Sequence, residues 1–282
     1  MSGERCSEIS LGAHESLVAT ATTAERWLLV EVPGSWPRDV SAVGALPAAA
    51  AAAVATWLEQ TPSSRLLFIR RPGRWSAQSL VFVIRSAESS VEVRRIELED
   101  TDELADVDLA RDGDRTDQQL VLICGHGSRD TCCALRGTAV YGALAERLGD
   151  EELWVSSHQG GHRFAANVLV LPSGLQFGRV EPDEAVSVVA RALQGQIELD
   201  RYRGRTCYAS MVQAAEWAVR EARELEGVES LRLTGVEGPV VRFRGRDGLE
   251  HSAQVEEAIG PSVPASCGAE PAPQAVFSAL VV

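Results

Sequence analysis

The chain has 282 residues, of which 45% are hydrophobic and 24% are charged, and its formal net charge at pH 7 is −13. This composition is that of a globular protein with a sizeable core, and the length suggests about two domains on a rough prior of ~150 residues each. The negative charge argues against nucleic-acid binding, which needs a basic surface to neutralise phosphates. It suits a basic partner protein attracted by long-range electrostatics.

The sequence shows no sign of secretion or membrane insertion. Residues 1–10 contain charges and no apolar stretch, unlike a signal peptide. The longest apolar run, at 48–58, is shorter than the ~18 residues that a membrane span requires. Six cysteines are too few for a disulfide framework in a chain of this length, so we expect reduced thiols or ligands. We therefore expect a cytoplasmic protein without a membrane partner.

The first 117 residues predict two strands joined by a helix, followed by a hairpin. The expected elements are a strand at 26–33, a helix at 47–60, a strand at 66–69 and a hairpin of strands at 80–84 and 91–98. The acidic segment 99–117 has the composition of a loop, and we interpret it as a connector between domains.

The same order of elements then begins again. The second set comprises a strand at 119–123, a helix at 133–148, a strand at 153–156, a hairpin of strands at 168–171 and 175–180, and a helix opened by Pro182. The apolar face expected for the first helix consists of Leu135, Ala139, Ala143, Leu144 and Leu148. We infer an ancient tandem duplication in which only the second copy keeps ligand-like residues.

A third region begins near residue 206. It predicts a helix at 208–226 and strands at 231–233 and 240–244. The tail at 261–273 is rich in Pro, Ala and Ser, and we expect it to be irregular.

Reactive side chains gather in two short segments of the second copy. One runs from Cys124 to Cys132 and Cys133, and the other contains His158 and His162. Two soft thiolates and two imidazoles are what a transition metal or an iron–sulfur cluster needs. Cys124 ends a predicted strand and Cys133 begins a predicted helix, where the helix dipole stabilises a thiolate. On spacing alone, Cys132 could replace Cys133.

The two histidines are four residues apart, which on a helix would place both on one face, as in zinc proteases. Gly160 and Gly161 lie between them, and two interior glycines would cost a helix ~2 kcal/mol relative to alanine. A loop is therefore expected, in which glycine lets the backbone approach a bulky inorganic group.

The spacing C-x8-C followed by H-x-G-G-H, each after a strand, resembles the sucrase/ferredoxin-like family, which carries a thioredoxin-like ferredoxin domain. The match continues through Gly125-His126, Ser128–Asp130, Arg163–Asn167 and the 171–182 hairpin, and it covers 118–204. Together with the repeat, it implies an α/β protein of tandem thioredoxin-like ferredoxin units and a small C-terminal α+β extension. The expected domains are a degenerate unit without ligands at 1–117, the ferredoxin unit at 118–205 and the extension at 206–282.

The resemblance also implies a cofactor, a [2Fe–2S] cluster with Cys124 and Cys133 on one iron and His158 and His162 on the other. Histidine ligation makes such a cluster easier to reduce, at ~−150 to +300 mV in Rieske centres against ~−400 mV in plant-type ferredoxins. We expect a proton-coupled one-electron carrier, rather than a catalyst, that serves an unknown redox partner. Residues that could support the ligands are His126, Arg129, Cys132, Gly160 and Gly161.

Two other functions fit the same residues. One is a structural zinc protein, and the other is a thiol-disulfide or arsenate-type reductase using Cys124 with Cys132 or Cys133. A thioredoxin-type reductase would normally show C-x-x-C. The other cysteines, Cys6, Cys207 and Cys267, are isolated in the sequence and are expected to be structural. The basic loop 70–74 is either a docking or anion site or a degenerate counterpart of the histidine loop.

Overall fold

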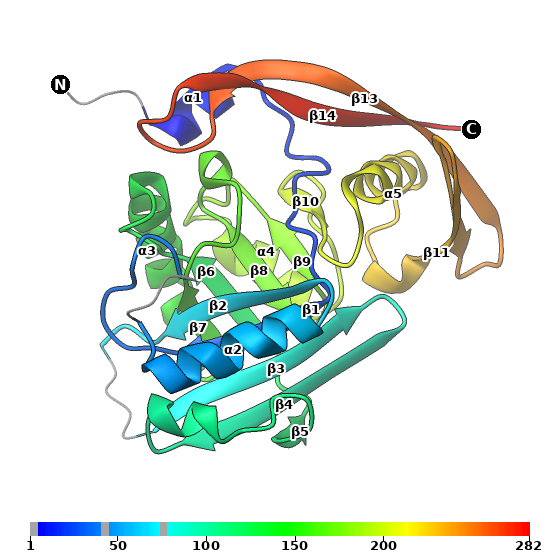
Figure 1. The fold of residues 1–282 in the computed structure, drawn as a ribbon. Coiled ribbons are helices and arrows are strands. Elements are labelled where there is room, and N and C mark those ends of the chain that lie inside the picture. Colours follow the sequence, from blue (N-terminus) through cyan, green and yellow to red (C-terminus); the bar gives the residue numbers. More distant parts are fainter. Residues whose placement is uncertain (1–4, 41–44, 74–77) are drawn as a thin grey trace.

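A computed structural model describes residues 5–40, 45–73 and 78–282 (Figure 1). In chain order the elements are α1 (Cys6–Gly12), β1 (Arg26–Glu31), α2 (Ala48–Gln60), β2 (Ser64–Arg70), β3 (Ser79–Ala87), β4 (Ser90–Leu98), the 3₁₀ helix η1 (Thr101–Ala105), β5 (Asp114–Thr116), β6 (Leu120–Cys124), α3 (Thr131–Ala145), β7 (Leu153–Ser156), η2 (His162–Phe164), β8 (Val168–Leu171), β9 (Leu175–Phe177), α4 (Ala185–Leu193), β10 (Tyr202–Arg205), α5 (Ser210–Arg223), η3 (Val228–Ser230), β11 (Leu231–Glu237), β12 (Val240–Gly245), β13 (Glu250–Pro264) and β14 (Pro271–Val281).

Ten strands form one mixed sheet in the order β10-β9-β8-β6-β7-β2-β1-β3-β4-β5. In the first half β1 pairs parallel with β2 and antiparallel with β3, and in the second half β6 pairs parallel with β7 and antiparallel with β8. The two halves therefore share one topology and meet where β2 pairs antiparallel with β7. The predicted α/β class is confirmed, and the repeat appears as a repeated strand order. The domain boundaries at 117/118 and 205/206 fall between elements and stay a prediction.

The burial of their side chains explains why the apolar segments of the sequence form strands. β6 is buried along its whole length, and the apolar residues of β1 are buried on both faces, as expected for parallel strands covered on two sides. On one face, Leu28 and Phe68 pack with Val54 of α2. On the other, the sheet curls onto itself, because Phe82 of β3 meets the ring of Trp154 of β7 at 5.9 Å across two intervening strands.

Helix α3 only partly buries the face that the sequence predicts. Its buried residues are Cys132, Cys133, Gly137, Val140 and Leu144. Of the predicted face, Leu144 is buried and Leu148 packs against the core, but Leu135 is exposed by 48%, so the prediction is wrong for the first half of the helix. Apolar periodicity did not include Gly137, which lies so close to β6 that an added Cβ would meet the Cys124 carbonyl oxygen.

The C-terminal extension is a second sheet of order β11-β12-β13-β14, packed against α5. The prediction of an irregular tail at 261–273 is wrong at both ends of this segment, because 261–264 belong to β13 and 271–273 to β14 of a long antiparallel hairpin, and only 265–270 form its turn. The strands tolerate proline at these positions for two reasons. Pro261 falls in the register shift between Ile259 and Ser262, and β14 is an edge strand with one side free of pairing.

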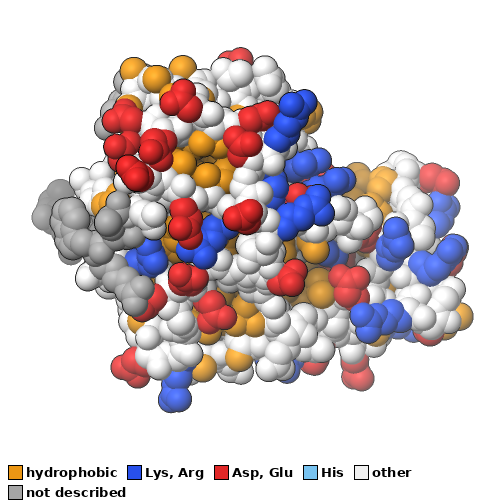
Figure 2. Space-filling view, turned by 90° about the horizontal axis from the view of Figure 1, so that it is seen from below, with side chains coloured by type: hydrophobic (Ala, Val, Ile, Leu, Met, Phe, Trp, Pro, Cys, Tyr) orange, Lys and Arg blue, Asp and Glu red, His pale blue; other side chains and the backbone are white. Residues whose placement is uncertain are grey.

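The sequence did not predict several elements of the structure. Among them are α1, β10, and η1 and β5 within the acidic connector. The β13–β14 hairpin (orange to red) passes over α5, and its turn lies beside the N-terminal helix α1, whereas the C-terminus itself lies on the opposite side of the molecule from the N-terminus (Figure 1). On the face seen in Figure 2, acidic side chains gather at the upper left and basic ones toward the right. Among the described residues, no helix is long and apolar enough to cross a membrane.

Candidate metal centre

The topology brings the two ligand-like loops together. Strands β6 and β7 are parallel neighbours, and Cys124 pairs with Ser156 at their last residues. Both following loops therefore emerge at the same edge of the sheet. The cysteine loop returns through Asp130, the N-cap of α3, whose carboxylate accepts the Cys132 N–H at 2.8 Å. Cys133 then lies in the first turn of α3, next to Cys124.

The structure brings together all four predicted ligands, which we call the quartet: Cys124, Cys133, His158 and His162. The Sγ atoms of Cys124 and Cys133 and a ring nitrogen of His158 lie within 4.8 Å of one another. His162 Nδ1 is 3.5 Å from Cys133 Sγ, and the two imidazoles stack with ring centroids 3.7 Å apart. Both cysteines and His162 are buried, whereas His158 is half-buried.

The histidines lie on the expected loop rather than on an α-helix. Gly160 and Gly161 have φ angles of +94° and +73°, a region that side-chain-bearing residues rarely adopt. A Cβ on Gly161 would also lie 2.5 Å from the Arg203 guanidinium. His162 then opens the short helix η2, which turns its imidazole back toward Cys133.

Two arginines that the sequence did not single out support this loop. Arg203 is 2% exposed and donates from Nη1 to the Gly160 carbonyl at 3.0 Å and to Asn167 Oδ1 at 2.7 Å. Arg65 donates to the His158 carbonyl at 3.0 Å. Arg203 belongs to the edge strand β10, and Arg65 to β2 of the other half. Nothing local distinguishes them from surface arginines, because their role depends on strands distant in sequence.

In the metal-free quartet, Cys124 is favoured as a thiolate and His162 as a neutral imidazole. Hydrogen bonding from Cys133, with His158 and the Gln159 N–H, holds the pKa of Cys124 well below its usual value, although burial opposes this. The same bond and burial raise the pKa of Cys133. Burial and the neighbouring His158 lower the pKa of His162 to about 4. A neutral imidazole keeps a ring nitrogen lone pair for a metal.

His126 connects the cysteine loop to the histidine loop. Its Nε2 lies 2.9 Å from the Pro37 carbonyl, and its Nδ1 accepts the His158 N–H at 3.3 Å, so the proton resides on Nε2. Burial lowers the pKa of His126, in keeping with the neutral form. Arg129 makes no hydrogen bond to the quartet, and its charge acts at longer range by lowering the pKa of His162.

Cys132 does not join the quartet. Successive residues of an α-helix point about 100° apart, and the Cys132 thiol meets Cys6 at 3.6 Å and Cys267 at 3.3 Å instead. Cys6 and Cys267, which are isolated in the sequence, thus both lie beside Cys132 in space. Hydrogen bonds from Cys6 and Ser7 lower the pKa of Cys132 to about 5. Cys207 lies apart, at the margin of the α5 core.

The counterpart loop of the first half is held by aromatic and ionic contacts. The Arg70 guanidinium lies 4.5 Å from the Trp36 ring centroid, and Arg71 forms a buried ion pair with Glu31 at 2.9 Å. These contacts favour the structural interpretation of the loop over an anion site. Arg74, the last residue of that predicted loop, lies outside the described residues.

Comparison with known proteins gives three findings. A family described as sucrase/ferredoxin-like matches residues 17–204. The protein named altered inheritance of mitochondria protein 32 of Meyerozyma guilliermondii is 38% identical over 101 residues, 32% of this chain and 36% of that protein. Its namesake in Debaryomyces hansenii is 33% identical over 97 residues, 31% and 36% of the two chains. The chain thus spans about a third of the length of these curated relatives.

Among solved structures, a thioredoxin-like [2Fe–2S] ferredoxin of Aquifex aeolicus is similar with a TM-score of 0.26 and 18% identity. The similarity covers 31% of this chain and 91% of that one.

Proposed function

The chain belongs to the sucrase/ferredoxin-like family, and from this premise we propose that the quartet holds a [2Fe–2S] cluster that carries single electrons. Cys124, Cys133, His158 and His162 would be its protein ligands. The proposal rests above all on one observation. Four soft or borderline donors, which follow two neighbouring strands, converge at one buried sheet edge.

The shape of the quartet supports a two-iron group. A single tetrahedral zinc ion needs its four donors mutually within about 4 Å, since zinc–ligand bonds are ~2.0 to 2.3 Å. Two of the described sets of donors that all lie within 4.8 Å include quartet residues, namely Cys124 with Cys133 and His158, and Cys133 with His162 and Asp130, and neither holds the whole quartet. Donors spread more widely than one ion requires suit a group with two metal ions. The glycines at 160 and 161 let the histidine loop adopt positive φ angles and pack closely against Thr22 and Arg203.

When bound, the cluster would accept and release one electron, and histidine ligation would raise its potential toward the Rieske range. The protein residues would set the proton chemistry. Each imidazole offers one nitrogen to iron and keeps an N–H on the other, and half-buried His158 can exchange that proton with solvent. Oxidised iron favours loss of this proton, so electron uptake and proton uptake are expected to be coupled.

Spectroscopy and voltammetry test the proposal. Anaerobically purified protein should absorb visible light and, once reduced, give an EPR signal of low average g value. Its potential should fall as pH rises above neutrality, by up to ~59 mV per pH unit for one electron and one proton. His162→Cys should keep a cluster of lower potential with a weaker pH dependence. His251→Ala, in the second sheet, serves as the control. A colourless protein holding zinc at the quartet would refute the proposal.

A thiol-disulfide or arsenate-type reductase remains the second candidate, because Cys124 is held as a thiolate beside the Cys133 thiol. That function needs neither imidazole as a ligand. A double variant, His158→Ala with His162→Ala, would abolish the cluster but spare a reductase. Reductase activity retained in this variant would favour the second candidate, and loss of visible absorption alone would favour the first.

The partner and the compartment are further parts of the proposal. The acidic chain suits a redox partner with a basic surface, and nothing in the geometry calls for nucleic acid or a lipid surface. All six cysteines are free thiols, as expected in a reducing compartment such as the cytoplasm. The relatives' name refers to mitochondria, so fractionation of cells that express the chain should test both compartments.

A further inference from the structure

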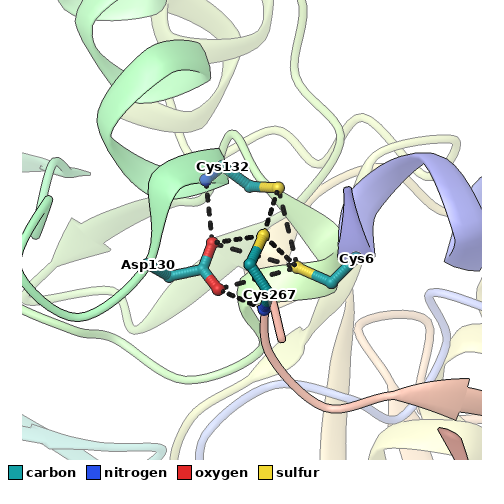
Figure 3. A group of neighbouring side chains, drawn as sticks. All are labelled: Cys6, Asp130, Cys132 and Cys267. Atoms are coloured by element: carbon teal, nitrogen blue, oxygen red, sulfur yellow. Dashed lines mark hydrogen bonds between the residues drawn. The ribbon is translucent and has the colours of Figure 1, made fainter. Parts of the chain in front are cut away.

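A second cluster of ligand-type side chains lies next to the quartet but shares none of its residues. Its members are Cys6 on α1, Asp130 and Cys132 at the start of α3, and Cys267 in the turn between β13 and β14. Figure 3 shows the three sulfurs and the carboxylate pointing into one common space. Cys6, Cys132 and Asp130 are buried, and Cys267 is half-buried.

The distances within this cluster are nearly uniform. Cys6 Sγ is 3.6 Å from both Cys132 Sγ and Cys267 Sγ, and the last two are 3.3 Å apart. Asp130 oxygens lie 3.7 Å from Cys6 Sγ and 3.6 Å from Cys267 Sγ. All four donors are mutually within 4.8 Å, which is not true of the quartet.

These distances are close to the edges of a tetrahedron around one metal ion. With zinc–sulfur bonds of ~2.3 Å, two thiolates on the same ion lie about 3.8 Å apart, and a thiolate and a carboxylate oxygen about 3.5 Å apart. A disulfide needs sulfurs ~2.05 Å apart and would leave the third thiol unpaired. The arrangement of three thiols and one carboxylate therefore points to a single ion.

We propose that Cys6, Cys132, Cys267 and one oxygen of Asp130 bind a zinc ion in a tetrahedral structural site. Thiolate ligands select zinc over magnesium or calcium. Four donors around one centre complete its coordination and leave no open position for catalysis. On binding, thiol protons pass to solvent as the sulfurs become thiolates.

The carboxylate is already oriented for this role. Asp130 accepts the backbone N–H of Cys132 at 2.8 Å and that of Cys267 at 2.8 Å, so both neighbouring ligand segments position it. The Ser7 hydroxyl donates to Cys132 Sγ at 3.3 Å and would keep that bond to a coordinated thiolate. Hydrogen bonds of this kind hold metal ligands in place before the metal arrives.

The site would join parts of the chain that are far apart in sequence. Cys6 and Cys267 are separated by 261 positions, and they lie on a short helix and in a hairpin turn, respectively. α1 has 7 residues, too few for a stable isolated helix. A zinc ion would fasten this helix and the tip of the β13–β14 hairpin to α3, directly beside Cys133 of the quartet.

Metal counting on the full chain tests the site independently of the quartet. Protein purified anaerobically from medium with both zinc and iron should hold about one zinc per chain. Cys6→Ser and Cys267→Ser should each lower zinc at least about fivefold and leave the iron content unchanged. Cys207→Ser, at the half-buried cysteine outside both clusters, should keep both metals. Asp130→Asn should release zinc faster to a chelator.

X-ray absorption at the zinc edge of the unaltered protein covers the case in which a cysteine variant does not fold. It should show three sulfurs at ~2.3 Å and one oxygen at ~2.0 Å. A shell of two sulfurs and two nitrogens would place the zinc at the quartet and overturn the inference. It would equally be overturned by zinc retained in Cys267→Ser, by a Cys132–Cys267 disulfide in the isolated protein, or by failure of the reduced protein to take up zinc.

Discussion

The contact between α3 and β6 gives the sharpest test of how the fold positions the quartet. A Cβ on Gly137 would lie 2.2 Å from the Cys124 carbonyl oxygen and 3.1 Å from its carbonyl carbon. Ordinary van der Waals contact begins at 3.4 Å. Gly137→Ala therefore requires α3 to retreat from β6 by about 1 Å. Because Cys124 ends β6 and Cys133 lies one turn before Gly137, the retreat separates two of the proposed ligands.

The cost follows from two opposing effects. Overpacking a rigid backbone contact costs about 3 kcal/mol at the upper end of the usual range, while alanine in place of an interior helical glycine contributes about 1 kcal/mol. We expect Gly137→Ala to lose about 2 kcal/mol of unfolding free energy, a fall in melting temperature of roughly 4 to 8 °C. Gly142→Ala is the matched control on the same helix, since its Cβ meets nothing within 4 Å.

Urea unfolding followed by circular dichroism, with iron counted per chain, measures both consequences. Gly142→Ala should be as stable as the unaltered protein or up to about 1 kcal/mol more stable, with unchanged iron. Gly137→Ala should be less stable and lose iron to a chelator more quickly. If the two variants were equally stable and held iron equally well, the close approach of α3 to Cys124 would not govern the site.

Two further predictions concern residues around the histidine loop. Arg203→Lys keeps a charge but loses the separate Nε, Nη1 and Nη2 donors that join Thr20 to Gly160 and Asn167. With about two charged hydrogen bonds of ~1.5 to 3 kcal/mol lost, urea unfolding should show a loss of about 3 kcal/mol or more of unfolding free energy. Wild-type stability would contradict this role. In metal-free protein, the His162 pKa of about 4 lies below the ~6.5 of an unfolded chain. The unfolded state therefore binds a proton first, and stability should fall from about pH 6.5 to about pH 4 by about 3 kcal/mol. His162→Asn should flatten this profile, and an unaltered profile would refute the argument.

Much of the fold could be predicted because its signals are local. The apolar runs of β1 and β6, the Pro-opened alanine-rich helix α2 and the turns of the hairpins each show within about ten residues, the scale of hydrophobic periodicity. The β13–β14 hairpin was missed because its prolines are tolerated only at a bulge and on an edge strand, and neither is visible before the pairing is known.

The quartet could be predicted for the same reason. Its two Cys and two His lie in two short sequence motifs, and Gly160 and Gly161 indicate that the histidines lie on a loop. The choice of Cys133 over Cys132 rested on the resemblance to a family. In the structure it rests on the rotation of about 100° between consecutive helical residues, which turns the two thiols toward different clusters.

By itself, the sequence determined which side chains are chemically able to bind a metal and which strands deliver them, because spacing along one chain segment decides both. Tertiary structure alone decided what lies around them. It placed Arg203 and Arg65 behind the histidine loop, and it brought Cys6 and Cys267 from opposite ends of the chain to Cys132 and Asp130. Such long-range contacts arise from the packing of the whole chain, so no local pattern records them.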